Sequence, residues 1–177
     1  MPGSPALRHL GRAARWVLPP VLLLGFAALP RVADADASLG ELHATTVRFH
    51  SVEQANRAGY FDNPLPCFDE GSNGMGEHLV NDQLLGDGGA LDASHPEALV
   101  YEVRPQGGWK LVAVEFIVLF DDAPPDGPAP ELFGQPFTQH SSLPLWKLHA
   151  WVHRDNPLGM FTDYSPDVAT CPGSSVP

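Results

Sequence analysis

Hydrophobic and polar positions in the second half of the chain predict three β-strands. Residues 98–104 and 109–120 are rich in β-branched and aromatic side chains, and residues 105–108 between them read Pro-Gln-Gly-Gly. That composition is typical of a hairpin turn. Residues 145–153 alternate strictly between two faces, which favours a third strand. We therefore expect a mostly antiparallel sheet.

A helical spacing precedes these strands. Residues that can face a core recur every three or four positions: Leu39, Leu42, Thr46, Phe49, Val52 and Ala55. This spacing predicts a helix over 39–58 that ends at Gly59. Ser51 and Gln54 also resemble a capping box, which would begin a shorter helix there. The predicted fold class is α+β, with a small mostly antiparallel sheet, one principal N-terminal helix and long irregular loops.

Two segments follow neither pattern. Residues 60–89 are rich in Gly, Asn, Asp and Pro, and are predicted to form a long irregular connection. Residues 121–144 contain many prolines, which disfavour helices and central strands. We expect this Pro-rich loop to lie on the surface, attached to the core through Leu132, Phe133 and Phe137.

The first 37 residues have the pattern of an export signal. Arginines precede an apolar stretch over 17–29, and small residues lead up to Ala37. The stretch is shorter than the roughly 20 residues of a spanning helix and is interrupted by Pro19 and Pro20. We therefore expect cleavage, no stable membrane anchor, and a single secreted or periplasmic domain over 38–177.

The net negative charge of that domain limits the classes of molecule that it can bind. The chain has a formal net charge of −11, and removal of the arginine-containing leader makes the remainder more negative. Such a surface repels nucleic acid and anionic lipid. Metal ions and small polar ligands suit it better, although an acidic surface also serves solubility alone. The sequence leaves the oligomeric state open.

Cys67 and Cys171 are the only cysteines in the chain. In an exported protein a single pair predicts a disulfide bond. A bridge that closes a loop of about 100 residues would stabilise the fold by about 4 to 5 kcal/mol in the chain-entropy treatment. Two free thiols or a shared metal are the alternatives.

Glu115 is unusual among the charged residues because the apolar run Leu-Val-Ala-Val-Glu-Phe-Ile-Val surrounds it. A buried ionised carboxylate is costly unless it is paired, hydrogen-bonded or bound to a metal. Burial can instead raise its pKa, as in many general acids and bases. Glu115 is therefore a candidate metal ligand and a candidate catalytic residue.

His149 and His153 lie four residues apart. On a helix they could share one zinc ion, but on a strand four residues span about 13 Å, too far for ligands about 2 Å from one ion. The alternation predicts a strand and therefore argues against a two-histidine metal site. His149 remains a candidate metal ligand if other helices or strands supply further ligands to the same ion. Alternatively, His149 is a buried histidine that makes a single hydrogen bond and has no functional role.

Two further residues are candidates for the same site. His78 lies in Gly-Ser-Asn-Gly-Met-Gly-Glu-His, whose glycines predict a flexible loop able to approach a ligand. Glu102 is a second candidate catalytic carboxylate. Glu102 lies on the same face of the sheet as Glu115 if Arg104 pairs with Trp109, but a shift of one residue in the strand register would place it on the opposite face. Alternatively, Glu102 is a charged residue of an edge strand that faces solvent.

Several short segments resemble a group of exported bacterial proteins to which no reaction is assigned. They are GMGEH, PEALVYE, LVAVEF, LHAW and NPLGMF, spread over roughly residues 39–172. The resemblance implies a single exported domain. It implies no substrate.

Three hypotheses follow for the function. The first is a binding domain in which His78, Glu115 and His149 hold zinc, copper, iron or a small polar ligand. The second is a metal-dependent or general-base hydrolase or oxidoreductase that uses the same group. The third is a structural or interaction protein that has no ligand.

Overall fold

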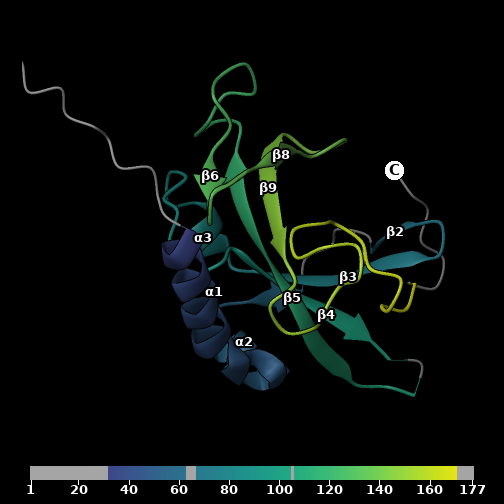
Figure 1. Ribbon diagram of the computed structural model, residues 1–177. Helices are drawn as coiled ribbons and strands as arrows, with labels where there is room; N and C mark the ends of the chain where they lie inside the picture. Colours follow the sequence, from purple (N-terminus) through teal and green to yellow (C-terminus); the bar gives the residue numbers. More distant parts are fainter. Residues whose placement is uncertain (1–31, 63–66, 105, 171–177) are drawn as a thin grey trace, which may run out of the picture.

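The computed structural model describes residues 32–62, 67–104 and 106–170, and shows an α+β fold (Figure 1). The helical part consists of α1 (Val32–Thr46), the 3-10 helix η1 (Val47–His50), α2 (Val52–Arg57) and the short α3 (Asp82–Leu85). The larger strands are β3 (Asn73–Val80), β4 (Ala98–Val103), β5 (Trp109–Leu119) and β9 (Leu145–Ala150). The short strands are β1 (Phe61–Asp62), β2 (Phe68–Glu70), β6 (Glu131–Leu132), β7 (Gln135–Pro136) and β8 (Thr138–Gln139).

The sheet is antiparallel throughout, with the strand order β1-β3-β4-β5-β9-β8, and β2 also pairs with β3. The predicted hairpin is confirmed as β4 and β5. Its register pairs Val103 with Trp109, and a bulge lies between Val100 and Tyr101. β5 is central because it pairs with both β4 and β9, so its side chains are buried on both faces.

One face of the sheet packs against the helices and forms the larger core. Leu79, Leu99, Phe116 and Leu148 on this face are almost fully buried. Leu42 of α1 is buried in the same cluster. Alternate residues of β4, β5 and β9 belong to this core, as the alternation in the predicted strands indicated.

The opposite face is covered by the segment that follows β9. Trp151 and Val168 of this segment pack against Val100 and Ala113, and Val80, Ala98 and Ile117 form a neighbouring apolar cluster. In Figure 1 this segment is the yellow coil on the side of the sheet away from α1 and α2. In β9 and in the part of β5 after the bulge, even-numbered residues such as Phe116 and Leu148 therefore face the helices, and odd-numbered residues face the opposite side of the sheet.

The predicted helix over 39–58 is divided into three pieces. α1 runs into η1, and α2 then begins at the N-cap Ser51, whose side chain accepts a hydrogen bond from the backbone N–H of Gln54 at 3.3 Å. The shorter helix that begins at Ser51 is therefore confirmed, but the capping box is only half formed, because the backbone N–H of Ser51 donates to the carbonyl oxygen of Arg48. Gly59, with φ +96°, follows α2 as predicted.

The prediction of a long irregular connection over 60–89 is wrong, because this region contains β3. Gly74 and Gly76 are strand residues at which a side chain would collide with backbone. A Cβ on Gly74 would lie 2.6 Å from the carbonyl oxygen of Ala169, and one on Gly76 would lie 2.7 Å from that of Tyr101. These glycines permit close approach of backbones, whereas sequence reasoning took them as signs of a loop.

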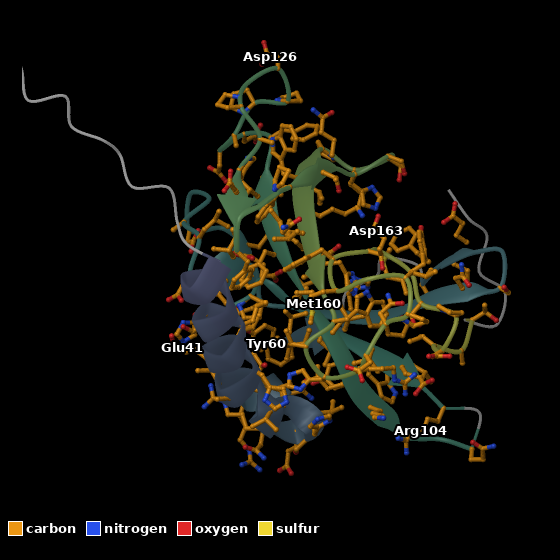
Figure 2. All side chains as sticks on the ribbon, in the orientation of Figure 1. Glu41, Tyr60, Arg104, Asp126, Met160 and Asp163 are labelled. Atoms are coloured by element: carbon orange, nitrogen blue, oxygen red, sulfur yellow. The ribbon has the colours of Figure 1, made fainter. Side chains whose placement is uncertain are left out.

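The Pro-rich loop over 121–144 is confirmed as a surface excursion. Figure 2 places Asp126 at its outer tip. Phe137 is buried, and Leu132 and Phe133 pack on the core, as expected. The short strand β8 joins the edge of the sheet.

No helix within the described ranges is long and apolar enough to cross a membrane. The predicted export signal lies largely outside these ranges. Cys171 also lies outside them, so the disulfide with Cys67 stays a prediction.

Candidate functional site

Three strands bring two histidines and a glutamate together on the face covered by the C-terminal segment. Glu115 of β5 pairs directly with His149 of β9 and, on its other side, with Ala98 of β4. His78 of β3 pairs with Val100 of β4, one side-chain repeat from Ala98. Because Ala98 carries only a methyl group, the longer side chains of His78 and Glu115 can meet above β4.

The donor atoms of these side chains lie close together. Nε2 of His78 is 3.4 Å from Oε2 of Glu115, and Nδ1 of His149 is 4.0 Å from Oε1. One donor atom from each of His78, Glu115 and His149 lies within 4.8 Å of the others. The two imidazole rings are nearly perpendicular, with an interplanar angle of 84°.

Burial decides the protonation state of these groups. It raises the pKa of Glu115 to about 7, partly offset by the charge of Lys147. It lowers the pKa of His78 to about 4 and holds the pKa of His149 well below its ordinary value. Without a cation, the carboxyl group of Glu115 is therefore largely neutral below pH 7, and the imidazole of His78 that it approaches is neutral above pH 4.

Several nitrogens in this group lack a hydrogen-bond partner within the described part of the chain. They are Nε2 of His78 and both ring nitrogens of His149. A buried polar atom that stays unpaired costs about 1 to 3 kcal/mol. The ring of His149 is 1% exposed and stacks on Trp151 at 4.8 Å, so its position is fixed by packing.

His78 presents Nε2 to Glu115. This nitrogen has no hydrogen-bond partner within the described part of the chain and lies 3.4 Å from Oε2 of Glu115. The backbone of Gly76 interacts with His78 and partly offsets the lowering of its pKa by burial. In many metal-binding histidines a backbone carbonyl that accepts a hydrogen bond from the other ring nitrogen fixes the tautomer.

The geometry fits a single metal ion. Donor atoms that share a tetrahedral ion at about 2.1 Å lie about 3.4 Å apart. The separation of His78 and Glu115 is 3.4 Å, but that of His149 and Glu115 is 4.0 Å, and the three donor atoms lie within 4.8 Å rather than 3.4 Å of one another, so binding requires the side chains of His78 and Glu115 to move closer to the packed ring of His149. Two neutral imidazoles and one carboxylate suit zinc, iron and copper.

A charged pair lies next to this group. Lys147, two residues before His149 on the same face of β9, forms an ion pair with Asp163 of the C-terminal segment. The side chain of Lys147 is only 8% exposed, and its charge affects the pKa of both Glu115 and His78. Figure 2 shows Asp163 on the coil beside β9.

The structure separates His149 from His153, as the strand prediction required. β9 ends at Ala150, earlier than expected, and His153 contacts α1 through a 2.8 Å hydrogen bond with the hydroxyl group of Thr46. That hydroxyl group donates to the carbonyl oxygen of Leu42, so Nε2 of His153 is the donor to Thr46. His153 also packs against the rings of His43 and His50, at 4.8 and 5.2 Å.

Glu102 lies on the same strand face as Ala98 but is not part of the donor group. Its carboxylate binds Arg154 at 2.6 and 3.1 Å and also accepts a hydrogen bond from the backbone of Ala169. The arginine holds the pKa of Glu102 below its usual range despite partial burial. These contacts give Glu102 a role in attaching the C-terminal segment.

Sequence reasoning missed three polar residues near the site. Glu97 is buried and accepts a 2.9 Å hydrogen bond from the backbone of Ile117. Lys147 could have been found, since it alternates with His149 on the predicted strand. His140 has no comparable signal, because it follows a Pro-rich segment whose path the sequence does not reveal.

Comparisons with protein families, curated proteins and solved structures found no match to this chain. The site's own geometry therefore carries the functional argument.

Proposed function

We propose that this protein is an exported metal-binding protein that holds one divalent transition-metal ion, zinc, iron or copper, between His78, Glu115 and His149. The observation that carries the proposal is the convergence of three donor groups in which Nε2 of His78 and both ring nitrogens of His149 have no hydrogen-bond partner within the described residues. One ion would bind Nε2 of His78, one ring nitrogen of His149 and the carboxylate of Glu115.

Electrostatics support the same conclusion. A divalent ion stabilises the ionised carboxylate of Glu115 and uses the neutral form that burial already favours in both histidines. The positive charge of Lys147 beside the site is offset by its ion pair with Asp163. An exported protein would acquire the ion outside the cytoplasm, in keeping with the predicted leader.

Metal analysis of the full chain, purified without chelator or affinity tag, tests the proposal. We expect about one ion per chain in the wild type and most of it lost in His78→Ala and His149→Ala. His95→Ala is the matched control, because His95 is an exposed histidine paired with Asp92. Reloading the emptied protein with zinc, iron(II) or copper(II) separately would identify the preferred ion.

The proposal is wrong if His78→Ala and His149→Ala bind as much metal as the wild type. It is also wrong if none of these ions binds with saturation to the reloaded wild-type chain.

A further inference from the structure

A small cavity lies directly beside the donor group. Its volume is about 30 Å³. Its polar walls are His78, Glu115 and His140. The remaining walls are apolar: Phe68, Met75, Val80, Ile117, Leu143 and Leu145.

The volume limits what the cavity can take. A water molecule needs about 10 to 15 Å³ of this kind of space, so the cavity holds about two or three atoms beyond hydrogen but no sugar, peptide or phosphate ester. The apolar walls favour a ligand that is held by the metal and by few hydrogen bonds. Because His78 and Glu115 belong to both the cavity wall and the donor group, a ligand there is adjacent to the proposed ion.

His140 is held in one orientation by the turn that follows β8. Its Nδ1 accepts hydrogen bonds from the backbone N–H groups of Ser142 and Leu143, both at 3.1 Å. In a neutral imidazole the other nitrogen then carries the proton, so Nε2 of His140 is a donor. The ring of Phe68 packs against His140 at 5.5 Å and supports this position.

His140 is therefore suited to a different task from that of His78 and His149. It is not among the residues whose donor atoms lie within 4.8 Å of one another. Its Nδ1 lone pair is already occupied by backbone N–H groups, and its Nε2 carries hydrogen. It can donate a hydrogen bond to a ligand but has no lone pair left for a metal.

We propose that this cavity is the open coordination position of the ion. It admits only a diatomic or triatomic ligand such as water, hydroxide, dioxygen or azide. The Nε2–H of His140 donates a hydrogen bond to that ligand. This inference rests on the proposed metal site. It narrows the chemistry to the binding of a small exogenous ligand on a metal, the arrangement common to zinc hydrolases and non-haem iron proteins.

Azide binding to the copper(II)-loaded full chain tests the inference, through the charge-transfer absorption of the copper–azide bond. The wild type should bind one azide per ion with saturation. His140→Phe keeps a ring but removes the donor, and should weaken azide about tenfold, the effect of losing one hydrogen bond to a charged ligand. His140→Gln retains an N–H donor and should recover part of the affinity. His95→Ala should leave it unchanged.

The outcomes separate this inference from the metal proposal. If the wild type binds none of copper(II), zinc and iron(II), the metal site itself is wrong. If copper binds but azide does not, or if His140→Phe and His140→Gln both bind azide as the wild type does, the site stands and the inference is overturned. Inorganic phosphate competing as strongly as azide would also overturn it, because phosphate does not fit the cavity.

Discussion

Glu115 is the residue on which the chemistry of the site depends, because its carboxyl group has two useful states. Burial raises its pKa to about 7, so the group is largely neutral below that pH when no cation is present. A divalent ion would hold it ionised. The Glu115 side chain can therefore remain buried as a neutral group in the metal-free protein and bind a metal ion as a carboxylate.

Glu115→Gln separates these two states. Glutamine has nearly the shape of the neutral carboxyl group. At pH 6 we therefore expect the free energy of unfolding of the metal-free variant to differ from that of the wild type by no more than about 1 kcal/mol. Zinc at about 100 times its Kd should stabilise the wild type by about 2.7 kcal/mol and leave the variant unaffected. Thermal denaturation in a chelator-free buffer measures both. A variant that is much less stable than the wild type, with no zinc effect on either, would favour the purely structural interpretation.

His153 gives the fold a dependence on acid that does not involve the metal. Burial lowers its pKa to about 4, with further lowering from His43 and His50, whereas the unfolded chain has the ordinary value of 6.5. The unfolded state therefore binds the proton more readily. The stability that depends on neutral His153 is present above pH 6.5 and is lost as the pH falls toward 4.

His153→Gln should reduce this loss, since glutamine can still donate to the hydroxyl group of Thr46 but does not titrate. Between pH 6.5 and pH 4, we expect the free energy of unfolding to fall by about 1 kcal/mol less in the variant than in the wild type. The expected difference is small because the ring of His153 is partly exposed. Urea denaturation of the metal-free chain at both pH values measures it, with the exposed His95→Gln as control. Parallel pH profiles for the wild type and His153→Gln would contradict this interpretation.

At the scale of elements, β3 shows how far the sequence could predict the fold. The β4–β5 hairpin and β9 followed from alternation and turn residues, and these strands carry Glu115 and His149. β3 was hidden because Gly74 and Gly76, which allow the backbone to pass close to Ala169 and Tyr101, also have the composition of a loop. His78 nevertheless lies beside Glu115 and His149, although its predicted loop is a strand.

Gly74→Ala tests the role of this close approach. The new Cβ would lie 2.6 Å from the carbonyl oxygen of Ala169, so the C-terminal segment must move. We expect a destabilisation of about 2 to 4 kcal/mol. Gly40→Ala in α1 is the control, because nothing lies within 4 Å of its added Cβ, and it should be neutral or stabilising by up to about 1 kcal/mol. Equal stability of the two variants would show that β3 and this segment are not tightly packed.

At the scale of the whole molecule, the segment after β9 works as a cover over the donor face. Trp151 and Val168 pack it onto the sheet, Asp163 pairs with Lys147, and Arg154 joins Glu102 to the backbone of Asp167. The partners of these residues come from distant strands and could not be predicted from the local sequence pattern. The cover explains why Glu115 and His149 are buried.

Arg154→Met should loosen this cover. The Arg154–Glu102 pair is only 16% and 13% exposed, so we expect its loss to cost about 2 to 3 kcal/mol and to increase hydrogen exchange over residues 160–170. Arg57→Met is the matched control, since Arg57 and its partner Glu53 are 68% and 76% exposed and such pairs contribute little. Similar exchange in both variants would mean that the ion pair does not hold the segment.

The most direct test of the central claim is anomalous X-ray diffraction from crystals of the full chain loaded with one equivalent of zinc. We predict a single strong peak bonded to Nε2 of His78, a carboxylate oxygen of Glu115 and a ring nitrogen of His149, each at about 2.0 to 2.2 Å. A peak on surface carboxylates or on the His43, His50 and His153 rings, with no anomalous density between His78 and His149, would contradict the account.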